Sequence, residues 1–189
     1  MINSKKGFTL IELLITIGVL AVLATVVVLV LNPAELFKQA RDSQRLSDLA
    51  AVRDAIVFTL GTESTTQTIG VVGNSSATGA TVCNAGAYAI FSAACTVDTD
   101  IDTDGTGWAA VNLTTASGGS PLARLPLDPV NSSAGATDYF YAYKGTSSNK
   151  FKLGATLEST KYTTTEDLDG TDGGTATGMY EIGTILTAI

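Results

Sequence analysis

The feature that most constrains this chain is an uncharged apolar run from Leu13 to Leu31, preceded by a single carboxylate at Glu12. A helix needs about 20 apolar residues to cross the hydrocarbon core of a bilayer, and this run has close to that length. An unpaired charge beside such a span costs a few kcal/mol or more in lipid. The segment contains no basic residue after Glu12, so we expect the partner of this carboxylate to come from outside it.

Two common interpretations of residues 1–31 leave part of the pattern unexplained. A secretory signal peptide has a shorter apolar region that ends in small residues at its cleavage site. The nearest approach to such a site lies at residues 21–24, well inside the apolar run. A plain transmembrane anchor, with its basic residues on the cytoplasmic side, explains the length and the basic flank but gives Glu12 no role.

A third interpretation rests on a resemblance. The apolar run begins with the sequence Lys5-Lys6-Gly7-Phe8-Thr9-Leu10-Ile11-Glu12-Leu13-Leu14. Together with the apolar residues that follow, this stretch resembles the prepilin leader and methylation motif of type IV pilins and type II secretion pseudopilins. The resemblance implies that a prepilin peptidase cleaves after Gly7 and methylates the new N-terminal residue, Phe8. It also assigns Glu12 to methylation and assembly.

The resemblance supplies the partner that Glu12 lacks, namely the amino group of Phe8 on a neighbouring subunit. An ammonium and a carboxylate that pair in a low-dielectric filament core recover much of each other's desolvation cost. Such a pair would also fix the axial stagger between subunits. Cleavage would remove Lys5 and Lys6 and make the formal net charge two units more negative than the −7 of the full chain.

Residues 32–60 follow the pattern of an amphipathic helix, and Gly61 predicts its end. Asn32, Pro33 and Glu35 form a helix-start signature, because Asn can cap, Pro suits the first helical position and Glu lies three residues after the cap. We therefore expect the helix to be interrupted or bent near Asn32. The apolar positions recur at three- and four-residue spacing. They are Leu36, Phe37, Ala40, Leu46, Leu49, Ala50, Val52, Ile56 and Leu60.

The charged residues of this segment alternate in sign between the apolar positions. They are Lys38, Arg41, Asp42, Arg45, Asp48, Arg53 and Asp54. We expect them to form a solvated face, on which pairs such as Asp42 with Arg45 and Arg41 with Asp48 contribute only tenths of a kcal/mol each. The interleaved aspartates also argue against nucleic-acid binding, which needs a basic patch.

Beyond this helix the chain is acidic, rich in Ser, Thr and Gly, and free of histidine. This composition fits a solvated, extracellular surface. The absence of histidine removes the commonest general base and the commonest transition-metal ligand. The sequence has no nucleophile–histidine pair, zinc-ligand spacing or phosphate-binding glycine loop. We therefore expect a protein that is not an enzyme and requires no cofactor.

The two cysteines, Cys83 and Cys95, have eleven residues between them. In an exported domain a disulfide is the expected state, whereas in a cytosolic one the thiols would be free. Closing a loop of this size contributes up to about 3 kcal/mol through loop-closure entropy. A redox-active pair would have much closer spacing. We therefore predict a structural disulfide.

A row of alternating aspartates forms a second candidate site. Asp100, Asp102 and Asp104, followed by a glycine, match the opening of a calcium-binding loop, in which alternate carboxylates converge on a hard cation. The position that should supply a bidentate glutamate holds Val111. A ligand from elsewhere, such as the acidic segment 166–172, would be needed. The open alternatives are a calcium site and a solvated acidic turn.

The sheet of the domain is predicted from period-two alternation. Residues 139–143 and 151–157 each alternate around a five-residue polar loop, which predicts a β-hairpin. We expect its apolar face to pack on the second half of the helix and to leave tyrosines or polar residues outside. Residues 108–113 and 179–184 are further predicted strands. The proline-rich stretch 121–131 predicts an ordered loop.

The residue pattern and the resemblance together predict four segments. They are a prepilin leader at 1–7, a transmembrane and filament-core helix at 8–31, an amphipathic stalk helix at 32–60 and a globular domain with an antiparallel sheet at 61–189. The expected fold class is α+β, pilin-like, with the second half of the long helix packed on the sheet.

This architecture favours a structural subunit of a type IV pilus-like surface filament. The resemblance implies the partners: further copies of the chain, a prepilin peptidase, an inner-membrane assembly platform and, before assembly, the membrane. The subunit would begin as a single-pass precursor in the cytoplasmic membrane and end in an extracellular filament. A pseudopilin of a type II secretion or competence system is the nearest alternative. An uncleaved, membrane-anchored binding or adhesion module is an alternative of another class, and it would not need Glu12.

Overall fold

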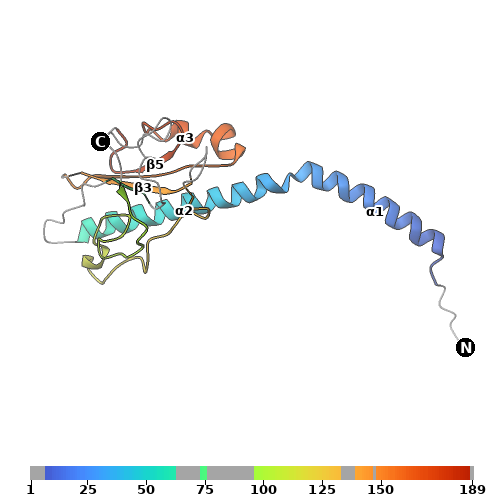
Figure 1. The fold of residues 1–189 in the computed structure, drawn as a ribbon, viewed down its shortest axis with the longest axis horizontal. Coiled ribbons are helices and arrows are strands. Elements are labelled where there is room, and N and C mark those ends of the chain that lie inside the picture. Colours follow the sequence, from blue (N-terminus) through green and yellow to red (C-terminus); the bar gives the residue numbers. More distant parts are fainter. Residues whose placement is uncertain (1–6, 63–72, 76–95, 133–138, 147, 188–189) are drawn as a thin grey trace, which may run out of the picture. The chain divides into compact units, whose positions relative to one another are not determined.

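The computed structural model describes residues 7–62, 73–75, 96–132, 139–146 and 148–187. The chain divides into two compact units, Met1–Phe37 and Lys38–Ile189. Helix α1 (Leu10–Leu31) belongs to the first unit, and most of helix α2 (Pro33–Thr62) belongs to the second. Figure 1 shows α1 in blue and α2 in cyan.

Helix α1 is apolar on all sides. It carries no charged residue after Glu12 and runs without a break through Gly18. Its described side chains are exposed. The stretch Leu10–Val28 is long and apolar enough to cross a membrane, and it is the one such stretch among the residues described. A helix that is apolar on every face is normally surrounded by protein or by lipid.

The helix is interrupted at Asn32, as the sequence predicts. Asn32 has φ 40° and ψ 73°, a left-handed conformation that Asn tolerates better than most residues. Pro33, whose missing N–H would be unpaired in any case, is the first residue of α2. The N–H groups of Glu35 and Leu36 donate to the carbonyl of Asn32 at 3.0 and 3.3 Å and start the new helix.

The second unit is built on a five-stranded sheet. Its strands are β1 (Gly73–Ser75), β2 (Thr96–Val97), β3 (Tyr141–Gly145), β4 (Phe151–Ala155) and β5 (Tyr180–Gly183). They lie in the order β2-β1-β3-β4-β5, and the neighbours are antiparallel except for β1 and β2. The predicted hairpin is β3–β4 and the predicted last strand is β5, so both predictions are confirmed.

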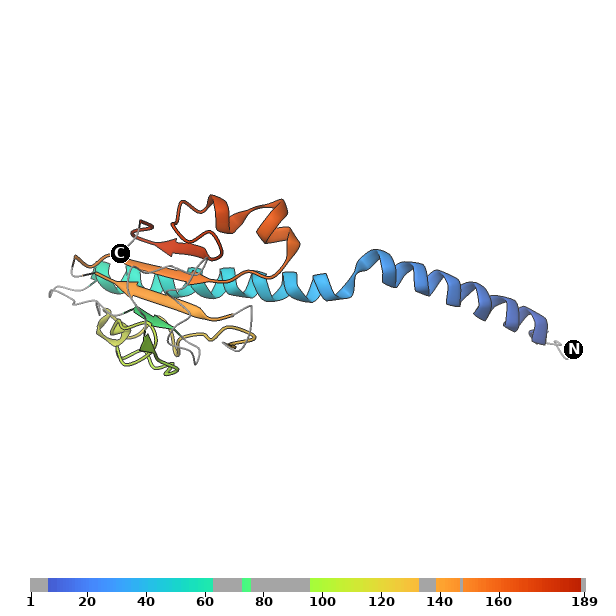
Figure 2. The same ribbon diagram turned by 45° about the horizontal axis from the view of Figure 1, so that its top comes forward.

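Helix α2 packs on one face of this sheet (Figure 2). The core between them includes Leu49, Val52 and Ile56 of the helix and Tyr141, Tyr143, Phe151, Leu153 and Ala155 of the strands. Tyr143 pairs with Leu153 and Tyr141 with Ala155, so the tyrosines share the inner face with the apolar residues of β4. Of the two expected alternatives for the outer face, tyrosines or polar residues, the structure excludes Tyr141 and Tyr143, which are buried in the core. The α+β fold with the helix packed on the sheet is confirmed.

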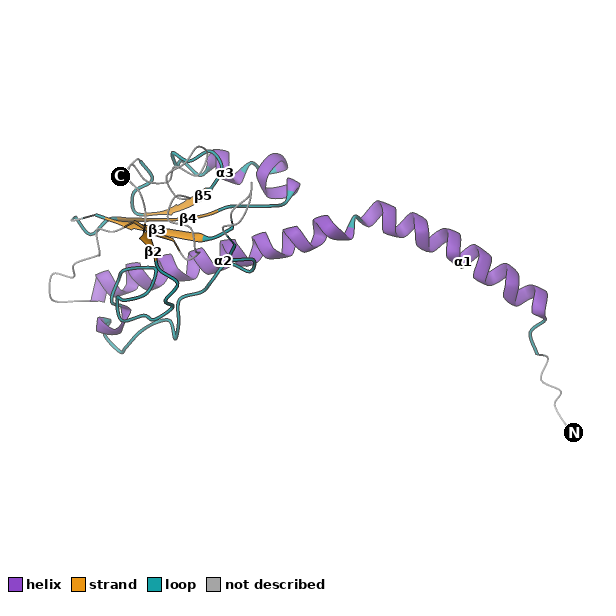
Figure 3. Ribbon diagram, in the orientation of Figure 1, coloured by secondary structure: helices purple, strands orange, loops and turns teal. Residues whose placement is uncertain are grey.

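The opposite face of the sheet is covered by the chain that follows β4. This segment contains a π-helical turn, η4 (Lys161–Thr165), and a short helix, α3 (Leu168–Thr171). Figure 3 shows it on the far side of the strands from α2. The sheet is therefore buried on both faces, which explains why every residue of β4 is buried.

Residues 108–113 are not a strand, contrary to the prediction. Trp108 and Ala109 are both buried, and burial of two adjacent side chains does not follow the alternation of a strand. The indole N–H of Trp108 donates to the carbonyl of Pro126 at 2.9 Å. The stretch thus supplies core side chains from a loop, and it packs on the segment 121–131, which is the loop that the sequence predicts.

Candidate assembly site

Gly7 and Phe8, the predicted cleavage pair, lie just before helix α1. Both are exposed, and Phe8 is 86% exposed. Thr9 follows as the residue that caps the helix, with an extended backbone at φ −77° and ψ 153°. The peptide bond between Gly7 and Phe8 is therefore accessible and lies outside the hydrogen-bond ladder of the helix.

Glu12 is paired within its own helix. Its Oε2 accepts the backbone N–H of Thr9 at 3.0 Å and the Thr9 hydroxyl at 2.9 Å, and the Glu12 N–H donates to Thr9 Oγ1 at 3.3 Å. These bonds form a capping box. The expectation that the segment itself holds no partner for Glu12 is therefore wrong. The Thr-x-x-Glu spacing that indicates such a box is visible in the sequence and could have revealed the pair.

The capping box lowers the free-energy cost of placing the Glu12 carboxylate in a membrane, but it does not neutralise the negative charge. A cap of this kind stabilises a helix by about 1 kcal/mol, and a negative group near a helix N-terminus gains about 0.3–1 kcal/mol from the helix dipole. The cost of an unpaired charge in a bilayer is larger, about 3 kcal/mol or more. A cationic partner for Glu12 is thus still favoured in a low-dielectric environment, and the predicted cleavage after Gly7 would create such a charge at the Phe8 ammonium.

Four charged side chains form a buried network between α2 and the loops of the sheet domain. Arg45 donates from Nε and Nη2 to the two oxygens of Asp128, at 2.6 and 3.0 Å. Its Nη1 donates to Asp42 at 2.8 Å and lies 2.6 Å from Glu158 Oε1. The side chains of Arg45, Asp42 and Asp128 are fully buried, and that of Glu158 is 5% exposed.

The predicted solvated face of α2 is wrong for Asp42 and Arg45. The predicted pair between them is present, but it lies inside the protein. Arg41 does not pair with Asp48; it donates to Glu158 through two hydrogen bonds of 2.8 and 2.6 Å. The spacing along the helix could not reveal these partners, because they come from loops that lie about 80 to 120 positions away in the sequence.

The network ties α2 to two loop segments. Asp42 accepts the backbone N–H groups of Glu158 and Ser159, at 3.0 and 2.7 Å. Asp128 accepts the two N–H groups at 130–131, at 2.8 and 3.1 Å. Each buried carboxylate therefore has both a cation and backbone donors, which is the condition for a stable buried charge.

The surroundings of two carboxyl groups in this region shift their pKa values in opposite directions. Burial opposes the ionisation of Glu158, but the hydrogen bonds and charges of Arg41 and Arg45 outweigh it and lower the pKa of that carboxyl. Asp48 accepts the hydroxyl of Tyr141 at 2.8 Å, and burial raises the pKa of the Asp48 carboxyl. Ionised Glu158 therefore stabilises the fold, whereas burial of Asp48 disfavours its ionised form.

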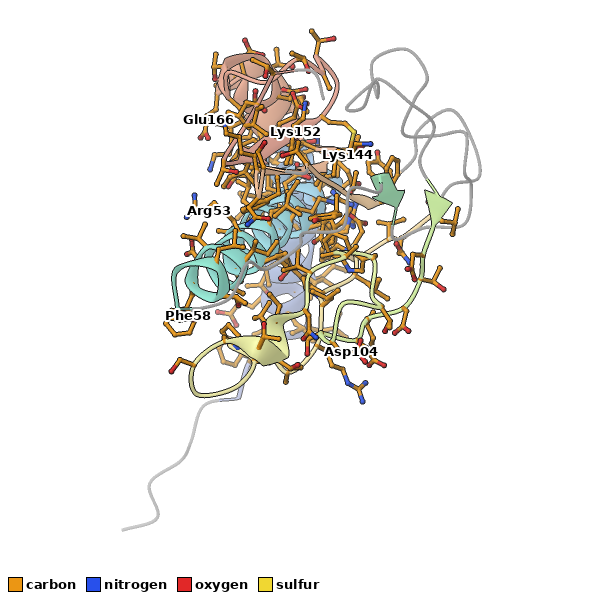
Figure 4. The ribbon with its side chains drawn as sticks, turned by 90° about the vertical axis from the view of Figure 1, so that its left-hand side faces the viewer. Arg53, Phe58, Asp104, Lys144, Lys152 and Glu166 are labelled. Atoms are coloured by element: carbon orange, nitrogen blue, oxygen red, sulfur yellow. The ribbon has the colours of Figure 1, made fainter. Side chains whose placement is uncertain are left out.

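A second buried ion pair lies on the other face of the sheet. Lys152 Nζ is 2.7 Å from Glu181 Oε1, and both side chains are fully buried; Figure 4 labels Lys152 among the strands. The second carboxylate oxygen of Glu181 accepts the N–H groups of Thr175 and Ala176. The pair fastens the loop after α3 to the sheet. Sequence reasoning missed it, because Lys152 occupies the polar position of an alternating strand.

The aspartates of the predicted calcium loop do not converge. Among the residues that the structure describes, no three acidic or other metal-ligating side chains lie close enough to share an ion. Asp100, Asp102 and Asp104 are exposed, and Figure 4 shows Asp104 at the margin of the domain. The carboxylates of Asp100 and Asp104 accept backbone N–H groups two residues further on, at 3.0 Å each. They stabilise their own turns.

Two site predictions lie beyond these observations. Calcium binding stays a prediction: heat on titrating calcium into the protein that is lost in Asp102→Asn would support it, and absence of heat in the unchanged protein would contradict it. Cys83 and Cys95 lie outside the described residues. Their disulfide also stays a prediction.

The N-terminal segment matches one family model, described as the prokaryotic N-terminal methylation motif, over residues 2–28. That range includes the predicted cleavage pair, the capping box and most of α1. No curated protein and no solved structure matches the chain. The match therefore supports the predicted processing motif and the apolar helix, and it does not extend to the sheet domain.

Proposed function

We propose that this chain, which belongs by its N-terminal methylation motif to the type IV pilin and pseudopilin family, is the structural subunit of a type IV pilus-like surface filament. Proteins of this family are structural subunits and not enzymes. They are processed by a prepilin peptidase and assembled into filaments. In the proposal, cleavage follows Gly7, Phe8 becomes the methylated N-terminus, and copies of α1 pack together to form the filament.

The observation that carries the proposal is the exposure, in a single copy of the chain, of a helix that is apolar on every face after Glu12. The large apolar side chains described in α1 are each at least 53% exposed. Burying one Val, Leu or Ile side chain contributes about 1.5–3 kcal/mol. The helix therefore requires lipid or protein around it. The membrane would provide this cover before assembly, and the α1 helices of other copies would provide it in the filament.

The capped carboxylate supports the same proposal. Glu12 lies at the N-terminal end of α1, two turns or less from the Phe8 position at which cleavage would create an ammonium. In a bundle of parallel helices with an axial stagger, the terminus of one copy can meet Glu12 of the next. An inner-membrane assembly platform would move the processed subunits from the cytoplasmic membrane into the extracellular filament, with the acidic sheet domain in solvent.

The test compares Glu12→Ala with the unchanged chain by electron microscopy of sheared filaments and by mass spectrometry of the N-terminus. We expect long fibres and a methylated Phe8 from the unchanged chain, and no fibres from Glu12→Ala. Glu166→Ala, which alters an exposed carboxylate of the sheet domain, is the matched control and should form fibres normally.

The other outcomes separate the alternatives. A cleaved and methylated subunit that forms no long fibre would indicate a pseudopilin. An intact Met1 in the mature protein, together with normal surface display of Glu12→Ala, would contradict the filament proposal and favour an uncleaved anchor.

A further inference from the structure

Lys152 and Glu181 bring an amine nitrogen into contact with a carboxyl group inside the sheet domain. They lie on the adjacent strands β4 and β5, and both side chains are fully buried. Lys152 Nζ is 2.7 Å from Glu181 Oε1, and Cδ of the carboxyl group is bonded to that oxygen. The nitrogen and Cδ are therefore close to the separation of about 3–3.5 Å from which well-oriented atoms react.

The two oxygens of Glu181 have different surroundings. Oε2 accepts the backbone N–H groups of Thr175 and Ala176. Oε1 accepts no aligned hydrogen bond among the residues that the structure describes, although Lys152 Nζ lies against it. Two N–H donors on one oxygen are the arrangement that stabilises an oxyanion when a nucleophile attacks the adjoining carbon. Oε1, which faces the amine, is then the oxygen that can leave.

We propose that Lys152 and Glu181 condense to an amide, which cross-links β4 to β5. The ammonium first passes one proton to Oε1. The lone pair of Nζ then forms a bond to Cδ, and the negative charge moves to Oε2, where the two N–H groups hold it. A second proton passes from Nζ to Oε1, the Cδ–Oε1 bond breaks, and water departs while Oε2 becomes the amide oxygen. An ammonium and a carboxylate together contain the atoms and the net charge of an amide and one water, so no further reactant is needed.

The burial of the pair favours this product. Each charge of a buried ion pair loses its hydration, and the partner recovers only part of that cost. A site closed to water therefore favours proton transfer within the pair, and the uncharged amide ends the cost altogether. Lys144 lies directly opposite Lys152 on β3, and Figure 4 labels both. Like charges at opposite positions of a ladder are destabilising, so the loss of the Lys152 charge is favoured on this side as well.

Trypsin digestion of the full chain, followed by mass spectrometry, tests the proposal. Trypsin cuts after a free lysine and not after one whose amine has become an amide. We expect peptide 151–161, uncut at Lys152, to be joined to the peptide that begins at Tyr162, with a mass one water lower than the two separate peptides together. Peptide 153–161 should be lost. The internal control is Lys161, which lies 3.5 Å from Glu166 with both side chains more than 40% exposed; trypsin should cut after it normally.

Two variants assign the cross-link to its residues. Lys152→Arg keeps a buried cation whose guanidinium stays protonated and does not attack, so the loss of water should disappear. Glu181→Asp draws the carboxyl group back by one methylene, and a misplacement of about 1 Å should slow the reaction about a hundredfold.

The decisive sample is the unchanged chain, which requires no variant to fold. Recovery of peptide 153–161 in full yield from this chain, with Trp108 fluorescence showing it to be folded, would overturn the proposal. The same cross-linked peptide in Lys152→Arg would also overturn it, by assigning the bond to another amine. The membrane-held precursor contains the same domain, so the result does not depend on whether the chain forms filaments.

Discussion

Replacing Arg45 with methionine is expected to destabilise the sheet domain by about 4 kcal/mol. The change removes the guanidinium that contacts Asp42, Asp128 and Glu158 and keeps an unbranched apolar stem in its place. Asp42 and Asp128 would remain buried without their cation. Arg41, which already pairs with Glu158, would be left to balance three carboxylates.

The magnitude follows from what each carboxylate keeps. Removing one partner of a buried ion pair costs about 3–5 kcal/mol, because a charge is left uncompensated. Asp42 and Asp128 each retain at least two backbone N–H donors, which keeps the loss within that range. Arg45→Lys should cost about 2 kcal/mol, since an ammonium preserves the charge but cannot reproduce the two-pronged contact with Asp128.

Urea unfolding followed by tryptophan fluorescence measures this change. Trp108 is the single tryptophan of the chain and is fully buried in the core, and the full-length protein would be kept in mild detergent. With a urea slope of about 2 kcal/mol/M, a loss of about 4 kcal/mol lowers the midpoint by about 2 M. Arg53→Met is the matched control. Arg53 pairs with Asp54 at the surface, where the two side chains are 38% and 67% exposed, so we expect a change below about 0.5 kcal/mol.

Equal midpoints for Arg45→Met and Arg53→Met would refute the reasoning. Such a result would mean that leaving Asp42 and Asp128 buried without the Arg45 cation does not lower the free energy of unfolding. A larger loss in Arg45→Lys than in Arg45→Met would refute it as well, because it would show that shape and not charge decides the contribution of residue 45.

Two further predictions concern pH and packing. The lowered pKa of Glu158 means that its contribution to stability is complete above the ordinary value of 4.5 and is lost as the pH falls through the folded-state value. The urea midpoint should therefore fall more steeply between about pH 5 and pH 3 in the unchanged protein than in Glu158→Gln, and equal slopes would contradict this assignment. A Cβ at Gly183 would lie 2.2 Å from the carbonyl oxygen of Phe151 on the adjacent strand, so Gly183→Ala should lower the free energy of unfolding by about 1–3 kcal/mol. Gly61→Ala, whose Cβ meets nothing within 4 Å, is the control and should leave stability unchanged or slightly raised; similar midpoints for the two variants would count against the packing argument.

The elements that could be predicted from the sequence are those specified by neighbouring residues. The uncharged length after Glu12 indicates α1, and Asn32-Pro33 indicates its interruption. Period-two alternation indicates the hairpin β3–β4. In each case the signal comes from backbone preference or from one repeating face, and both act over a few residues.

The buried polar contacts could not be predicted, because their partners are distant in the sequence. Asp42 and Arg45 have the spacing of a solvated helical pair, and only the loop that carries Asp128 encloses them. Trp108 and its neighbours fill the core from a loop, where no periodicity marks burial. At the candidate site the local signal was present. Thr9 and Glu12 have the spacing of a capping box, and the partners of the carboxylate are a hydroxyl and an N–H rather than a cation.

The interruption at Asn32 separates the N-terminal helix into two cooperative segments. A helix grows through hydrogen bonds from each N–H to the carbonyl four residues earlier, and every new segment must be nucleated again. Pro33 has no N–H to carry that series across the break. Local melting of α1 therefore does not propagate turn by turn into α2. Under the proposed function, α1 can lose and regain helical turns as its surroundings change from lipid to protein, while the sheet domain that is displayed outside the cell stays folded throughout.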